Sequence, residues 1–315
     1  MSFLLLTAIS WAEPASQLLA QGRVDEAVVS LQNKLAANPD DAESHNLLCR
    51  AQLSLGNWDA GIANCQKAVA LEPGNSEYHL WLGRIYGGKA EHASFLSGAS
   101  LAKKVRDEFE TAVRLDPRSS EARADLADFY VEAPGIVGGG KDKAERQAVE
   151  LGALDPPQGY LVKAHIAEKN NNWDQAEGDY RDAIRVSGGR PGPWMSLAQF
   201  YRRRGRLGEM EDAIHHAVST QANQHILIPA AETLLRSNTD LPFAAELVHR
   251  YLASDTVEDA PAFKAHYLLG SILEQQGNKA AAAQEYRSSL ALARNFTLAQ
   301  AALKKLAGHY QPVSD

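Results

Sequence analysis

Apolar residues recur along the chain with the period of an α-helix, in short segments separated by polar turns. In one segment Trp194, Leu197, Ala198 and Tyr201 fall at i, i+3, i+4 and i+7, which places their side chains on one helix face. Gly205 follows, as glycine often does where a helix ends. The same spacing returns in other segments. The pattern predicts an all-α chain of short amphipathic helices, each with an apolar face to bury against a neighbour.

Prolines divide the first half of the chain into units of similar length. Pro39, Pro73, Pro117 and Pro156 each follow a helical segment, and successive prolines are 34, 44 and 39 residues apart. A unit of 34 residues, lengthened by an insertion in two cases, accounts for all three spacings. A fixed period of this size is typical of arrays in which each unit is a pair of helices.

The unit at 42–75 shows the internal pattern of such a repeat. Leu48 lies in its first helical segment, Gly56-Asn57-Trp58 forms a tight turn, and Gly61 and Ala68 follow at helical spacing in the second segment. Together, the period and this pattern resemble the tetratricopeptide repeat (TPR) family. The resemblance implies a right-handed α-solenoid, a superhelix of stacked helix-turn-helix hairpins.

We expect about eight repeats over residues 13–296. Each hairpin buries too little apolar surface to be stable alone, so the repeats are expected to stack on one another. The unit at 225–258 is degenerate, since it keeps the apolar spacing but lacks the signature Gly and Trp. Residues 297–315 are expected to form an amphipathic capping helix and a tail. We place the repeats at 8–41, 42–75, 76–119, 120–156, 157–190, 191–224, 225–258 and 263–296.

Two insertions lengthen the third and fourth repeats. The first lies within 87–102, between the two helices of the third repeat, and its apolar residues predict a short helix that packs back on the array. The second covers 132–143, where Pro134 is expected to end one helix and the next is expected to begin near Lys141. With its Pro-Gly-x-x-Gly-Gly insertion the chain resembles a subgroup of bacterial TPR proteins, from which no catalytic residue carries over.

The second insertion also fits the first part of a phosphate-binding P-loop, Gly135-x-x-x-x-Gly140-Lys141. A P-loop needs Ser or Thr after the lysine and a strand before the loop, whereas Asp142 follows the lysine here and the preceding residues are typical of a helix. A helix-connecting turn is therefore expected. A nucleotide- or anion-responsive protein using residues 134–143 is kept as an alternative, and neither catalysis nor a cofactor is predicted.

Residues 1–12 have the layout of a secretory signal peptide. An apolar run at 3–9 precedes small residues at Ser10 and Ala12, although no basic residue lies before the run. We therefore expect an exported, periplasmic or otherwise extracytoplasmic protein. A cytoplasmic protein whose first helix is apolar is the alternative. No other segment approaches the ~20 apolar residues of a membrane span, so integral membrane insertion is not expected.

Charge and cysteine content narrow the function further. The chain carries 32 Lys and Arg against 39 Asp and Glu, a formal charge of -7, which disfavours nucleic acid as a partner. Two cysteines cannot form a four-thiolate zinc site, and the adjacent His215 and His216 point to different helix faces, so no metal site is predicted. Cys49 and Cys65 occupy repeat positions that face each other in TPR packing. Both a disulfide and two buried thiols stay open.

The resemblance also implies a binding surface, because the first helix of each TPR repeat lines a concave groove. Arginines there would take carboxylates or backbone carbonyls, Trp81 could be an aromatic anchor, and the aspartates would prefer a basic stretch. The alternative for each position is an ordinary solvated residue. The candidate partner-binding residues are Asn46, Arg50, Trp81, Arg84, Asp125, Asp128, His165 and Arg202.

These observations favour a non-catalytic scaffold or adaptor in the bacterial cell envelope that holds a segment of a protein partner in its groove. A cytosolic TPR regulatory module is the alternative within the same fold.

Overall fold

The computed structural model describes residues 13–219 and 224–308. The predicted signal peptide, residues 1–12, lies outside the described residues. Within them the chain is helical, and its only β-type contact is an isolated bridge between Val257 and Ala260. No helix in the described ranges is both long and apolar enough to cross a membrane. The predicted all-α solenoid is confirmed.

Most helices pair as antiparallel hairpins with the next helix along the chain, and the hairpins stack in sequence order. The first half contains α1 (Ala15–Ala20), α2 (Val24–Ala37), α3 (Ala42–Leu55), α4 (Trp58–Leu71), α5 (Ser76–Glu91), α6 (Phe95–Leu115), α7 (Ser120–Glu132), η1 (Gly135–Val137) and α8 (Lys141–Leu154). The second half contains α9 (Pro156–Lys169), α10 (Trp173–Val186), α11 (Pro191–Arg203), α12 (Leu207–Val218), η2 (Gln224–Ile226), α13 (Leu227–Ser237), α14 (Leu241–Leu252), α15 (Ala262–Gln275), α16 (Lys279–Leu292) and α17 (Thr297–Gly308).

The sequence signals that define these helices act locally. Side chains of Asn75 and Ser119 accept hydrogen bonds from backbone N–H groups at the starts of α5 and α7, which satisfies donors that the first helical turn leaves free. Asp155 does the same at α9, where Pro156 is the first helical residue and loses no hydrogen bond. These caps lie in the same turns as Pro73, Pro117 and Pro156, the prolines that mark the hairpin period in the sequence.

The first insertion lengthens a hairpin and adds no separate helix. Both α5 and α6 run past their neighbours and meet at a turn around His92, and α6 is the longest helix, with 21 residues. Phe95 and Leu96 at this tip are 87% and 81% exposed. The predicted short helix packing back on the array is therefore wrong, because the extra residues continue α5 and α6, and Phe95 and Leu96 stay uncovered where the two helices join.

The second insertion has the predicted form. Helix α7 ends just before Pro134, the 3₁₀ turn η1 follows, and α8 begins at Lys141. Val137 is buried and its carbonyl accepts a hydrogen bond from Arg106 of α6 at 3.3 Å, which fastens the loop to the preceding hairpin. Lys143 Nζ donates to the Gly138 carbonyl at 2.9 Å, and no strand precedes the loop. The lysine and glycines thus complete a turn.

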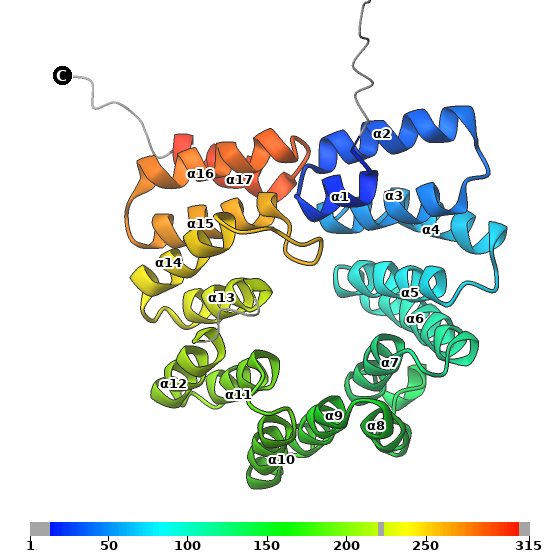
Figure 1. Cartoon of the computed structure of the whole chain (residues 1–315), viewed down its shortest axis with the longest axis vertical. Coiled ribbons are helices and arrows are strands. Elements are labelled where there is room, and N and C mark those ends of the chain that lie inside the picture. Colours follow the sequence, from blue (N-terminus) through cyan, green and yellow to red (C-terminus); the bar gives the residue numbers. More distant parts are fainter. Residues whose placement is uncertain (1–12, 220–223, 309–315) are drawn as a thin grey trace, which may run out of the picture.

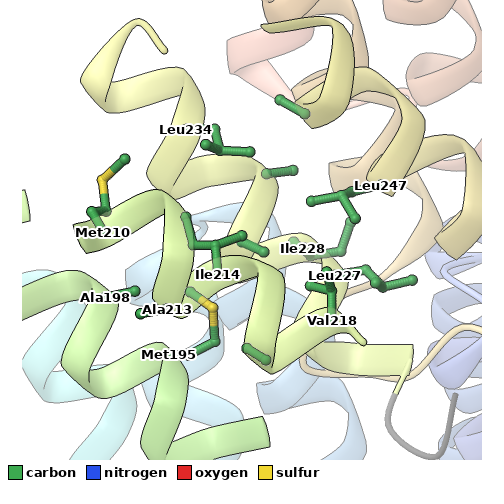
Figure 2. Packing of buried hydrophobic residues seen from close by; sticks show 14 of the residues in the cluster. Met195, Ala198, Met210, Ala213, Ile214, Val218, Leu227, Ile228, Leu234 and Leu247 are labelled. Atoms are coloured by element: carbon green, nitrogen blue, oxygen red, sulfur yellow. The ribbon is translucent and has the colours of Figure 1, made fainter. Parts of the chain in front are cut away.

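Apolar side chains from successive hairpins interdigitate into a core that runs along the array. Figure 2 shows part of it, a cluster to which α11 contributes Met195 and Ala198, α12 contributes Ile214, and α13 contributes Ile228 and Leu234. Because the degenerate unit at 225–258 contributes fully to this core, loss of the signature residues has not interrupted the stacking.

The solenoid curls until its two ends meet (Figure 1). The N-terminal helices α1 to α3 lie beside α15 to α17, while α5, α7, α9, α11 and α13 face the inside of the ring and their partners lie outside. Phe263 of α15 is fully buried in one apolar cluster with Leu18, Leu19 and Leu48 from the N-terminal helices and with Phe296. We call this contact between the two ends the closure.

Polar contacts between residues more than 200 positions apart complete the closure. Arg50 of α3 holds Glu258 through two hydrogen bonds of 2.7 and 2.5 Å. The Thr256 hydroxyl donates to the Ala20 carbonyl at 2.9 Å, and Asp25 accepts from the backbone N–H of Arg294 at 3.0 Å. Each end therefore supplies both charges and backbone groups to the other, as well as apolar surface.

Gly22 offers a direct test of the closure. It has φ +71°, and a Cβ there would collide with the backbone of Ala262 in the opposite end. We expect Gly22→Ala to open the ring. Small-angle X-ray scattering should then give a larger radius of gyration, and denaturant titration should give a lower free energy of unfolding.

The matched control is Gly188→Ala. Gly188 has nearly the same φ, +70°, but open space around it. Both substitutions force an L-residue into the left-handed region, which costs about 1 kcal/mol. Gly188→Ala shows this backbone cost alone, so any further effect of Gly22→Ala comes from the collision with Ala262. Equal scattering profiles for both variants would show that the ends do not depend on this contact.

Candidate functional site

The inner face of the ring is hollowed along three consecutive repeats. A cavity of about 380 Å³ lies between α7, α9 and α11, which are the first helices of their hairpins. Its walls combine apolar residues such as Leu161 and Pro193 with the polar side chains of Asp128, Gln199 and Arg203. A second cavity of about 480 Å³ adjoins it, because His165 and Arg203 line both. We call the two together the inner groove.

Charged side chains on neighbouring repeats pair across this groove. His165 of α9 lies between two carboxylates of α7: its Nδ1 is 3.3 Å from Asp128 Oδ1 and its Nε2 is 2.8 Å from Glu132 Oε1. Lys169 reaches the other oxygen of Glu132 at 2.6 Å. Arg203 of α11 holds Glu168 of α9 through hydrogen bonds of 2.5 and 2.8 Å. The pairs fix the spacing of the helices that form the groove.

These contacts change the pKa values of two groove residues, His165 and Glu132. Hydrogen bonding to Asp128, with the negative charge of both carboxylates, raises the pKa of His165 above its ordinary value although partial burial opposes the shift. Burial alone would raise the pKa of Glu132, but the hydrogen bond from Lys169 and the charge of His165 outweigh it and lower that pKa. The network is therefore most strongly held when His165 carries its proton.

The residues predicted around Trp81 form a second polar ladder, nearer the closure. The guanidinium carbons of Arg50 and Arg84 each lie 4.7 Å from the centroid of the Trp81 rings. Arg84 also pairs with Asp125 at 2.6 Å and with Glu121 at 2.7 Å. The predicted cations thus come together, but each is already bound to carboxylates of this chain.

Asn46 does not fit the predicted binding role. It is only 2% exposed, and its Nδ2 has no hydrogen-bond partner in the described part of the chain. Helix α3 contacts α1, α2, α4 and α5 and contributes to the closure cluster, so its surface is covered more completely than in an open array. Asn46 is inaccessible to a partner in the closed ring, which corrects the assignment made from repeat positions.

The structure places Arg203 in the groove, while Arg202, the predicted residue, is half-buried on the same helix. Sequence reasoning missed Arg203 by one residue, although a signal existed: Glu168 and Arg203 lie 35 positions apart, about one repeat, with opposite charges. Asp128 and His165, two of the predicted residues, line the groove. Asp125 instead pairs with Arg84. Burial raises the pKa of Asp125, although the charge of Arg84 opposes the shift.

Cys49 of α3 and Cys65 of α4 form a disulfide, and no free cysteine remains among the described residues. Of the two alternatives left open by the sequence, the structure has the bonded one. The bridge joins the two helices of one hairpin and adjoins Leu48 and Arg50, which belong to the closure.

The adjacent histidines, His215 and His216, each stack on an aromatic ring. His216 stacks on Trp194 with ring centroids 4.3 Å apart, and His215 stacks on Phe243 at 4.7 Å. Over residues 13–219 and 224–308 no group of three or more His, Cys, Asp or Glu side chains is arranged to hold a metal ion.

Models of known protein families match the sequence. Two models described as tetratricopeptide repeat match the chain, one over residues 18–85 and the other over 161–214 and 233–295. The chain belongs to the tetratricopeptide repeat family. Its members are protein-interaction scaffolds, so a protein partner is the expected ligand of this TPR array.

The chain is also similar to solved structures. Yeast Tom70 is 17% identical, with a TM-score of 0.54 over 99% of this chain and 69% of its own. A thermophilic TPR protein from Thermus thermophilus is 22% identical with a TM-score of 0.47, covering 70% of this chain and 95% of its own. A TPR protein from Parabacteroides merdae is 14% identical, with a TM-score of 0.47 over 93% and 96%. No curated protein matches the TPR chain in sequence.

The disulfide should stabilise the TPR array measurably. Closing a loop of this size stabilises a folded chain by about 3 kcal/mol in the chain-entropy model, so reduction or the double substitution Cys49→Ala/Cys65→Ala should lower the unfolding free energy by about that amount. Denaturant titration with and without reductant measures it. Intact mass after thiol blocking should show no labelled cysteine in the unreduced protein, and two labels would contradict the bridge.

The groove should be more stable at mildly acidic than at alkaline pH. A histidine whose folded-state pKa is raised stabilises the fold fully below its ordinary pKa, and this contribution is lost as the pH rises through the raised value. In the wild type we expect the free energy of unfolding to fall from pH 6 upward as His165 loses its proton. His165→Gln should make this fall smaller. His225→Gln, a control outside the groove, should leave it unchanged. An NMR titration in which His165 has an ordinary or lowered pKa would contradict the expectation.

Proposed function

We propose that this protein is a scaffold whose inner groove holds a segment of a protein partner. The carrying observation is the pair of adjoining cavities along α7, α9 and α11, which offers one continuous hollow lined by both apolar and hydrogen-bonding side chains. Such mixed linings suit a polypeptide, whose side chains alternate with backbone amides that need partners.

The charges of the groove support an extended partner with mixed polarity. Arg203 is bonded to Glu168, and His165 to Asp128, through side chains that stay partly in solvent. Exchanging the His165–Asp128 pair for contacts with a ligand costs little, since exposed ion pairs contribute only about 0–1 kcal/mol. Glu168 is only 11% exposed, so its pair with Arg203 is expected to stay intact and keep the helices in place. His165 can therefore both order the groove and recognise a partner.

An extracytoplasmic location in a bacterial cell envelope is part of the proposal. The disulfide supports it, because such bonds persist in oxidising compartments and are rare where glutathione and thioredoxin keep thiols reduced. The signal-like residues 1–12 point the same way. The anion-binding alternative for residues 134–143 gains no support, since Lys141 pairs with Glu145 and Lys143 with a carbonyl of the loop itself.

Crosslinked capture from the native host tests the groove. Gln199 lines it without a role in the ion pairs, so Gln199→Arg should block the hollow while leaving the fold intact. The expected result is a specific partner captured by the wild type and at least about tenfold depleted with the variant, as for loss of a residue at the centre of an interface.

The matched control is Gln284→Arg, the same substitution on the exposed face of α16. It should capture the partner as the wild type does. Equal capture by all three proteins, each shown to be folded by its thermal transition, would move the binding surface away from the groove.

A further inference from the structure

The closure creates a cavity that neither end of the array contains alone. Its volume is about 680 Å³, within the range of small-molecule sites. One wall comes from the N-terminal half, at the turn between α3 and α4 and at His92. The other wall comes from α13, α15 and the turn that leads into α17. We call it the closure cavity.

Apolar and aromatic side chains dominate its walls. Trp58 and Leu53 line it from the N-terminal side, and Leu235, Tyr267 and Phe296 line it from the C-terminal side. Trp58 is held in place by His92, whose ring centroid lies 5.3 Å from its own. The cavity therefore presents a pre-formed surface for an apolar body, with ring faces from both ends of the chain.

One cation in this apolar setting has no carboxylate in direct contact. Lys264 of α15 lines the cavity and is partly buried, and among the described residues Glu232, which also lines the cavity, and Asp259 act on it only through longer-range attraction, without a close ion pair. Arg236, the other strong cation there, is paired with Glu232 at 3.7 Å. Burial lowers the pKa of Lys264, although the negative charges of Glu232 and Asp259 oppose the shift. An anionic group brought next to it would add the close ion pair that these carboxylates do not make.

We propose that the closure cavity binds a small amphipathic carboxylate, with the carboxylate on Lys264 and an apolar chain between Trp58 and Phe296. A cationic ligand would be repelled by Lys264, and a neutral one would cover the ammonium without compensating its charge. A straight-chain fatty acid of medium length satisfies both requirements, namely an apolar body and a single negative head group.

The ligand would also strengthen the closure, because it would contact both ends of the chain at once. Anything that binds only the closed arrangement shifts the equilibrium toward it. This inference is independent of the groove and of its protein partner. Occupancy of the cavity would show in scattering or thermal unfolding even if the groove bound nothing.

Isothermal titration with decanoate, decanol and decyltrimethylammonium tests the assignment, with tryptophan fluorescence as a second signal. Decanoate should bind, and decanol and the cation should bind at least about tenfold more weakly, as expected for loss of one charge-assisted hydrogen bond in a partly dry site. Decanoate should also raise the thermal transition of the wild type.

Three variants separate charge from packing. Lys264→Met keeps the apolar stem and should lose decanoate binding by about tenfold or more, whereas Lys264→Arg keeps the charge and should retain it. Lys163→Met removes an exposed lysine on α9 and serves as the matched control. Decanol binding as tightly as decanoate, a Lys264→Met variant with unchanged affinity, or no binding of decanoate to the folded wild type would each overturn the proposal.

Discussion

The apolar contact between the two ends of the array constrains the rest of this structure. A solenoid normally has two terminal helix faces that no further repeat covers, and each must be made polar or hidden. Here the faces cover each other, with Phe263 buried among N-terminal leucines and Phe296. The curvature of every intermediate hairpin has to be compatible with this meeting, so small rotations between repeats are fixed by a contact outside them.

The closure also decides what Arg50 can do, because Arg50 lies where the ends meet and is bound to Glu258. Next to it, Arg84 beside Trp81 is bound to Glu121 and Asp125 of the adjacent repeat. The groove at α7, α9 and α11 lies away from the closure, and its pairs join adjacent repeats only. The same kinds of residues thus hold the ring together at one place and line a hollow at another.

The sequence was informative wherever the controlling interactions are local. Pro134 ends a helix through its own ring, and Asp155 caps the helix that follows it, so helix boundaries were predictable there. Cys49 and Cys65 were predicted to face each other because the resemblance to TPR repeats places them at facing positions of one hairpin. The exposed tip at Phe95 was not predictable, since apolar composition does not reveal whether a neighbour is within reach.

The sequence by itself determined the helical period, the repeat family and the facing positions of the two cysteines, because these follow from contacts within about 34 residues. Whether the cysteines are bonded was left open. Only the tertiary structure decided that Asn46 is buried, that Arg50 binds Glu258 and that Lys264 lines a cavity between the two ends. Those facts depend on the summed rotation of all the hairpins. An error of a few degrees at each step would separate the ends, and no short sequence pattern encodes that sum.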